Sequence, residues 1–165
     1  MQRIRRIAGG PKVYLNPDSF HIAGLGPYKV WQYWDVIVAS IKKGNPEAAG
    51  DKVTMVNIMG AIMSGGAQTW AFFSKKEGRL TFLGCAVTTI QENQFTRYKS
   101  LSVLSLYSAH PLGLPCLRKM VMQGKEFADE NGCVSVTGII ADERIARLAK
   151  KLGFKSAILA TSEVM

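Results

Sequence analysis

The order of periodic segments predicts an α/β (α+β) fold, in which a mixed, mostly antiparallel sheet carries helices on both faces. Three strand-like segments at 68–75, 80–90 and 98–107 follow one another closely enough to pair as hairpins. A helical segment then separates the third from another strand-like run at 133–140. A strand, a helix and a strand in that order form a crossover, which makes the two strands parallel. We therefore expect one parallel pair, formed by 98–107 and 133–140.

The bulk properties suit one domain over residues 1–165, with 1–26 as an N-terminal arm that contains a short strand near 12–15. No apolar run reaches the roughly 20 residues that a membrane span requires. The three cysteines, Cys85, Cys116 and Cys133, are too widely spaced for a disulfide framework or a zinc site. They are typical of buried thiols in a reducing compartment, so we expect a cytoplasmic protein with no metal site and no membrane partner.

A formal net charge of +9 predicts either an anionic partner or a well-solvated basic surface. Nucleic acid, an acidic protein and the phosphates of a nucleotide cofactor all fit such a charge. The lysine pairs Lys42-Lys43 and Lys150-Lys151 fall in last turns of expected helices, where cations offset the helix dipole. No nucleic-acid motif accompanies the charge, so a solvated surface is the better interpretation.

Two helices are expected before the first hairpin. Pro27 begins the first, which ends at Gly44, and the second covers 51–64. Apolar residues at helical spacing define one face of each: Val30, Trp31, Trp34, Ile37, Val38 and Ile41 in the first, and Val53, Val56, Met59 and Met63 in the second. We interpret Trp31 and Trp34 as core residues rather than a ligand platform. The Met-rich second segment also fits a buried strand.

The crossover helix is expected at 112–130, with Leu114, Leu117, Val121 and Ala128 on its buried face. A last helix follows Asp142 and ends at Gly153, with Phe154 as its hydrophobic closure. Its apolar residues Ile145, Leu148 and Leu152 are expected in the core. A short final strand is expected near 156–160.

This order of elements, with two motifs, resembles the GNAT superfamily of acyl-CoA N-acyltransferases. The resemblance covers about a third of the chain closely, from Leu101 to Phe154. The superfamily motif Gln/Arg-x-x-Gly-x-Gly/Ala falls on 110–115, where Gly113 is kept, His110 replaces the first residue and Pro115 the last. A second motif, Asn-x-x-Ala-x-x-Leu-Tyr-x-Lys-x-Gly-Phe, falls on 142–154, with Asp142 at its Asn position and Ala149 at its Tyr position.

The resemblance implies acetyl-CoA or a related acyl-CoA as co-substrate. Backbone amides of Leu112, Gly113, Leu114 and Cys116 would bind its pyrophosphate, and the strand backbone at Ser105 and Tyr107 would pair with its pantetheine arm. The free amides at a helix start attract an anion in any case. The alternative is a rigid turn, shaped by Pro111 and Pro115, that has lost the ligand.

The resemblance also implies direct attack of an amine on the thioester, assisted by a base and an acid. Alanine at 149 cannot act as the acid. The remaining candidates for a catalytic group are Tyr107, His110 and Asp142, with Glu92 as a further acidic residue. Asp142 also suits a plain helix cap, and His21 is expected to be structural or exposed.

The leading hypothesis is an N-acyltransferase that moves an acetyl or other acyl group from acyl-CoA to the amine of a small molecule or protein, with activity that is weak or lost. The alternative is a non-catalytic GNAT-like scaffold. Tailed bacteriophages encode divergent GNAT-like proteins, some with roles in virion assembly, and such a protein would be found in the virion or the infected host cell. A nucleic-acid-binding module rests on charge alone. The sequence predicts no particular oligomeric state.

Overall fold

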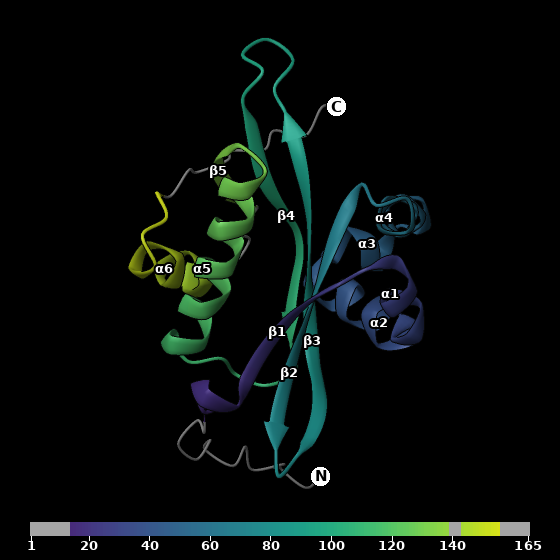
Figure 1. Cartoon of the computed structure of the whole chain (residues 1–165). Helices are drawn as coiled ribbons and strands as arrows, with labels where there is room; N and C mark the ends of the chain where they lie inside the picture. The colour runs from purple at the N-terminus through teal and green to yellow at the C-terminus, as the bar shows by residue number, and fades with distance from the viewer. Residues whose placement is uncertain (1–13, 139–142, 156–165) are drawn as a thin grey trace, which may run out of the picture.

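One sheet with helices on both faces forms the protein (Figure 1). The computed structural model describes residues 14–138 and 143–155. Within them the strands lie in chain order across the sheet. They are β1 (Phe20–Leu25), β2 (Ala67–Lys76), β3 (Arg79–Glu92), β4 (Lys99–Ser108) and β5 (Cys133–Gly138).

The sheet is antiparallel from β1 to β4, and β5 pairs with β4 in parallel. Helix α5 (Leu114–Glu130) makes the crossover between the parallel strands, as the sequence predicts. Together with α6 (Glu143–Lys151) it covers one face, and α1 (Pro27–Gln32), α2 (Trp34–Gly44), α3 (Pro46–Gly50) and α4 (Lys52–Met63) lie on the other (Figure 1). This arrangement is the predicted fold class and confirms the GNAT fold.

Of the strand expected near 12–15, the structure describes only residues 14 and 15, which belong to no strand; the first described strand is β1, after a short 3₁₀ turn η1 (Pro17–Ser19). Asn16 caps that turn with its side chain, which accepts a hydrogen bond from the amide of Asp18 at 3.0 Å. The chain therefore joins the sheet after this turn. Phe20, the first residue of β1, is fully buried against Phe72, with ring centroids 5.9 Å apart. The final strand expected near 156–160 lies outside the described residues.

The helix expected from Pro27 to Gly44 is divided in two at Tyr33. The ring of Tyr33 packs on Phe73 and Phe82, with centroid distances of 5.8 and 6.1 Å. These contacts favour a break in the helix at Tyr33, which lets the ring reach the sheet. The prediction that Trp31 is a core residue is wrong. Its side chain is 62 % exposed and packs against the ring of Trp34 on the protein surface.

The predicted helix at 51–64 is present as α4, but it buries a different side from the one expected. Met55, Ile58, Met59 and Ile62 are buried, whereas Val53, Val56 and Met63 are exposed. Because apolar residues occur all around this helix, its sequence pattern does not single out a face, and docking on the sheet decides. Helix α3, just before it, was not predicted.

Two hydrophobic clusters lie on opposite faces of the sheet. Cys85 belongs to the cluster under α1, α2 and α4, and Cys116 to the cluster under α5. The core expectation for α6 fails at Leu148, which is 36 % exposed, and the side chain of Ile145 lies outside the described part. Gly153, with φ of +90°, ends α6 as expected, and the amide of Phe154 donates to the carbonyl of Ala149 at 3.0 Å.

Among the described residues, no helix combines the length and the apolar character needed to cross a membrane.

Candidate active site between strands β4 and β5

Among the described residues, β5 pairs in parallel with the first half of β4 only. Pairing runs from Lys99 and Cys133 to Val103 and Gly138, and β4 then continues to Ser108 with no described partner on that side. Helix α5 begins just beyond the end of β4. Ligands of sheets with parallel strands bind outside strand ends where the connections diverge. The distal part of β4 (104–108) and the start of α5 therefore form the candidate site.

A β-bulge lies at Leu104, directly after the last described pair of β4 and β5. On its β3 side, Val87 pairs with Ser105 and Thr88 with Val103, which leaves Leu104 as the extra residue. The side-chain amide of Asn45 donates a hydrogen bond to the Leu104 carbonyl at 2.9 Å. The Asn45 oxygen also accepts a bond from the amide of Ala48 at 3.0 Å. Asn45 thus holds the bulge from the α2 side of the sheet.

The C-terminal end of α2 lies directly on β4. A Cβ atom placed on Gly44 would come within 2.6 Å of Ser105 Oγ and 2.7 Å of the Leu106 carbonyl oxygen, so only glycine permits this approach. The buried Ser105 hydroxyl donates to the carbonyl of Ile41 at 3.4 Å. The Ser105 side chain therefore points to α2, and only its backbone remains as the predicted contact with a pantetheine arm.

Tyr107 lies near the end of the distal part of β4 and is half-buried. The Lys43 ammonium approaches its hydroxyl oxygen at 3.5 Å and lies 5.1 Å from the ring centroid. On the other side of the strand, Gly84 of β3 packs so closely on the Tyr107 carbonyl that a Cβ atom would clash with it. Tyr107 is thus held between two elements, with its hydroxyl next to a cation.

The predicted pyrophosphate turn leads into α5. Gly113 is the N-cap, with φ −71° and ψ 165°, and no side chain caps the helix. The amides of Gly113, Leu114 and Cys116 lack partners within the helix, and Pro115 contributes none. The exposed cations Arg118 and Lys119 follow in the next turn.

The segment before β1 packs beside this turn. A Cβ atom on Gly113 would lie 3.5 Å from Tyr14 Cβ, an ordinary contact distance. The fully buried Cys116 thiol lies 3.7 Å from the Leu15 carbonyl oxygen, and the Lys119 ammonium donates to the Pro17 carbonyl. Burial raises the pKa of the Cys116 thiol, partly opposed by the nearby Lys119 charge. The Cys116 side chain is therefore structural, and only its amide is available to a ligand.

The other predicted groups are dispersed. His110 is exposed beyond the end of β4, and its carbonyl accepts a hydrogen bond from Ser108 Oγ at 2.9 Å. Asp142 lies outside the described residues. Ala149 is half-buried in α6. His21 is exposed on β1, at the rim of a recess of about 380 Å³ lined also by Tyr33 and Phe73, and neither Tyr107 nor the α5 turn contributes to that recess.

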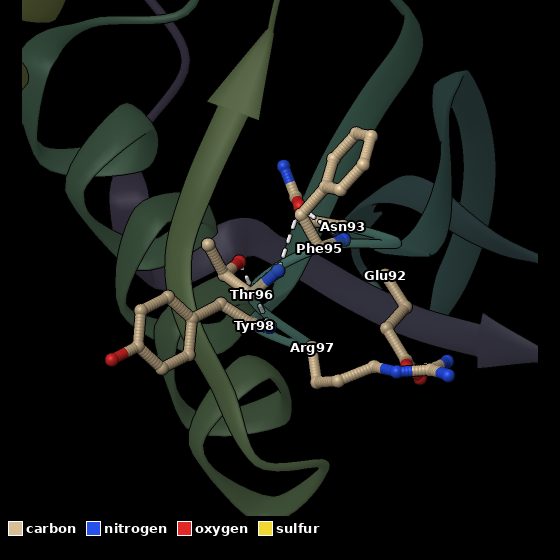
Figure 2. A network of polar contacts seen from close by, with 6 residues as sticks. All are labelled: Glu92, Asn93, Phe95, Thr96, Arg97 and Tyr98. Carbon is tan, nitrogen blue, oxygen red and sulfur yellow. Dashed lines mark hydrogen bonds and ion pairs between the residues drawn. The ribbon is translucent and has the colours of Figure 1, made fainter.

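Glu92 does not belong to the site. It ends β3 at the far end of the sheet, where Glu92 pairs with Lys99, and its carboxylate binds Arg97 at 3.1 Å (Figure 2). Asn93 organises the same hairpin end by accepting the amides of Phe95 and Thr96 at 2.9 and 3.0 Å (Figure 2). Tyr107 is eight residues further along β4, about 27 Å at the usual rise of a strand.

Sequence reasoning missed Lys43, Gly44 and Asn45. Lys43 was interpreted as a helix-dipole cation and Asn45-Pro46 as a break in the chain, and both local interpretations hold in part. The contacts of these residues with β4 link positions 59 and 64 residues apart. No local signal in the sequence indicates them. No group of three or more His, Cys, Asp or Glu side chains suited to a metal ion occurs within the described ranges.

No family model and no curated protein matches this sequence. Solved structures do match its fold. An aminoglycoside acetyltransferase from an uncultured soil metagenomic sample has 17% identity and a TM-score of 0.61, with coverage of 89% of this chain and 99% of the other. A predicted acetyltransferase from Clostridium acetobutylicum, solved with acetyl-CoA, has 10% identity and a TM-score of 0.63 over 88% and 96%. Glucosamine-6-phosphate N-acetyltransferase from Arabidopsis thaliana has 12% identity and a TM-score of 0.57 over 88% and 97%. At these identities the likeness establishes the fold alone.

Proposed function

We propose that this protein is an acyl-CoA-dependent N-acyltransferase that moves an acetyl group to the amine of a small molecule or protein. The observation that carries the proposal is the distal part of β4 beyond the Leu104 bulge, which has no partner on its β5 side among the described residues and leads to a helix start without a side-chain cap at Gly113. That combination offers strand hydrogen bonds to a peptide-like pantetheine arm and amides to a pyrophosphate. The structural neighbours, all acetyltransferases and one of them solved with acetyl-CoA, support it.

The chain offers amide donors at Gly113, Leu114 and Cys116 for the pyrophosphate. Pro115 removes one donor from the turn, so the amides alone form a weaker anion site than a turn without proline would. Arg118 and Lys119 lie one turn further along α5, where their charges attract phosphate groups. Compared with a turn that lacks proline, this turn would therefore hold the co-substrate with fewer backbone amides and with more side-chain charge.

In the reaction, a neutral amine attacks the thioester carbonyl carbon. A C–N bond forms, the C–S bond breaks, the amine loses a proton and the departing thiolate gains one. Tyr107 is the described residue best placed to supply that proton, because it lies near the end of the distal part of β4. Lys43 can only donate to the phenol oxygen, which leaves the phenol proton free to point elsewhere.

The first test is calorimetry with acetyl-CoA. The backbone angles of Gly113 suit any residue and a side chain there meets only ordinary contacts, so Gly113→Glu should fold. Its negative charge would lie at the phosphates, and we expect affinity to fall at least about tenfold, the effect of one unfavourable charge contact. Gly124→Glu adds the same charge in the middle of α5 in open space and should bind as the wild type does.

If the folded wild type does not bind acetyl-CoA, this co-substrate is excluded. If both glycine variants bind it equally, the co-substrate site lies elsewhere on the protein.

For catalysis, Tyr107→Phe should lower the rate of CoA release by about 10²–10⁴-fold, the usual contribution of one general acid. Tyr98→Phe is the matched control, because Tyr98 lies exposed just before the other end of β4. Equal rates for the wild type and Tyr107→Phe would exclude this residue as the acid.

A further inference from the structure

Lys43 is the charged side chain that the structure brings to the candidate acid. Its ammonium lies 3.5 Å from Tyr107 Oη and 5.1 Å from the ring centroid, although the two residues are 64 positions apart. A lysine in the last turn of α2 is already explained by the helix dipole, and the neighbouring Lys42 supplies that charge as well. The dipole does not explain why Lys43 lies over the tyrosine.

The residues on both sides of Lys43 fix its position. The Ile41 carbonyl accepts the Ser105 hydroxyl, Gly44 contacts the Leu106 carbonyl, and the Asn45 amide binds the Leu104 carbonyl at 2.9 Å. These contacts hold the last turn of α2 on the distal part of β4. The backbone of Lys43 therefore cannot move away from Tyr107 without breaking the contacts that hold the bulge.

The Lys43 charge is not neutralised by any described side chain. Among the side chains that the structure describes, which do not include that of Glu47, the one ion pair joins Arg97 and Glu92 at the opposite end of β4. An ammonium exposed at the surface attracts anions over several ångströms and repels cations over the same range. The overall charge of +9 adds attraction for anionic molecules that approach from solution.

We propose that Lys43 selects the acceptor, and that the acceptor is an amine whose own molecule carries an anionic group, a carboxylate or phosphate. The inference rests on the acyltransferase function proposed above. An acceptor amine that attacks a thioester near Tyr107 must come within a few ångströms of Lys43. A polycationic acceptor is repelled there, whereas an acceptor with an anionic group binds Lys43 and presents its amine beside Tyr107.

The test compares acceptors that differ only in the anionic group, namely glucosamine with glucosamine 6-phosphate and phenylalaninamide with phenylalanine. Release of CoA is followed by chromatography at fixed acetyl-CoA. We expect the wild type to favour the anionic member of a pair by about two- to fivefold in kcat/KM, mostly through KM, because one surface charge contact is gained. A preference in the phosphate pair alone, or in the carboxylate pair alone, identifies which anion the site takes.

Variants of Lys43 assign the preference to this residue. Lys43→Ala should abolish it, Lys43→Glu should invert it and Lys43→Arg should keep it, since the guanidinium preserves the charge. Lys42→Ala is the matched control, an exposed lysine of the same turn, and should keep the preference. Lys43 is exposed, so melting temperatures should stay close to that of the wild type.

Two results would overturn the proposal. Turnover by the wild type with equal or greater kcat/KM for glucosamine and phenylalaninamide than for their anionic counterparts would exclude selection of an anionic acceptor, while the acyltransferase function would stand. A preference that survives in Lys43→Ala would assign selection to another residue. If the wild type transfers acetyl to none of the amines, the proposed function fails, and the choice of acceptor fails with it.

Discussion

At the scale of single residues, the site depends on close approaches that only small residues allow. Gly44 lets the end of α2 lie on the backbone of β4, and Gly84 lets β3 lie equally close to Tyr107. Neither role comes from turn formation, since Gly44 has an ordinary helical position. The position of Tyr107 therefore depends on the lack of a side chain at Gly44 and Gly84 as well as on its contacts. Substitutions at these two glycines should affect the site through packing.

Gly44→Ala tests this packing. The new Cβ atom would lie 2.6 Å from Ser105 Oγ and 2.7 Å from the Leu106 carbonyl oxygen, so α2 must shift away from β4. We expect the free energy of unfolding to fall by about 1–3 kcal/mol, as for other overpacked sites. Denaturant titration measures the change. Gly60→Ala, on α4 with nothing within 4 Å, is the control and should gain about 0.4–1 kcal/mol. Unchanged stability of Gly44→Ala would contradict the assignment.

At the scale of elements, helix boundaries follow local chemistry even where packing faces do not. Asp51 caps α4 by accepting the amides of Val53 and Thr54 at 3.0 and 3.2 Å and the Thr54 hydroxyl at 2.6 Å. The Thr54 hydroxyl, followed by the two amides, lowers the pKa of the Asp51 carboxyl from its usual value of 3.8. The start of α4 is therefore stabilised by a charge that depends on pH.

The sign of that dependence follows from the lowered pKa. The stabilisation by ionised Asp51 is fully present above pH 3.8 and is lost as the pH falls through the lower pKa of the folded state. We expect Asp51→Asn, which caps without titrating, to show a smaller loss of melting temperature between pH 5 and 2 than the wild type, and Asp51→Ala to melt lower at neutral pH. Thermal unfolding followed by circular dichroism gives both results. Parallel acid profiles for the wild type and Asp51→Asn would rule out this contribution.

At the scale of the whole molecule, the sheet separates two hydrophobic clusters, each with a buried cysteine. Cys85 lies under α2 and Cys116 under α5, while Cys133 at the start of β5 is only partly covered. Burial raises the pKa of the Cys85 thiol to about 12, with a smaller opposing effect from Ser40. The thiolate is the reactive form, so the two buried cysteines should be inert in the native protein.

Alkylation with iodoacetamide at pH 8, read by mass spectrometry, should therefore modify Cys133 first and leave Cys85 and Cys116 unmodified until the protein is unfolded. The raised pKa of Cys85 also makes stability fall as the pH rises from about 9 towards 12, because the unfolded chain loses this proton first. Cys85→Ala should reduce that alkaline loss. Alkylation of Cys85 as fast as Cys133 in folded protein would show that the cluster under α2 opens.

Local sequence patterns predict the hairpin from β2 to β3, the crossover with its parallel pair of β4 and β5, and the glycine that ends α6. These features depend on periodicity and turn chemistry within short stretches of chain, which a sequence displays directly. The turn at Gly113 could be located for the same reason. Its role toward a ligand remains a prediction.

Only the tertiary structure decided which side of α4 is buried, where the first helix breaks, and that Lys43 lies beside Tyr107. The segment before β1 reaches Cys116 across 101 residues in the same way. Each of these features depends on how elements dock after they form. An apolar helix fits the sheet in more than one rotation, and a lysine in a last turn looks the same in sequence whether it faces solvent or a tyrosine. The choice is made by packing against residues far along the chain, such as the close contact of Gly44 with β4.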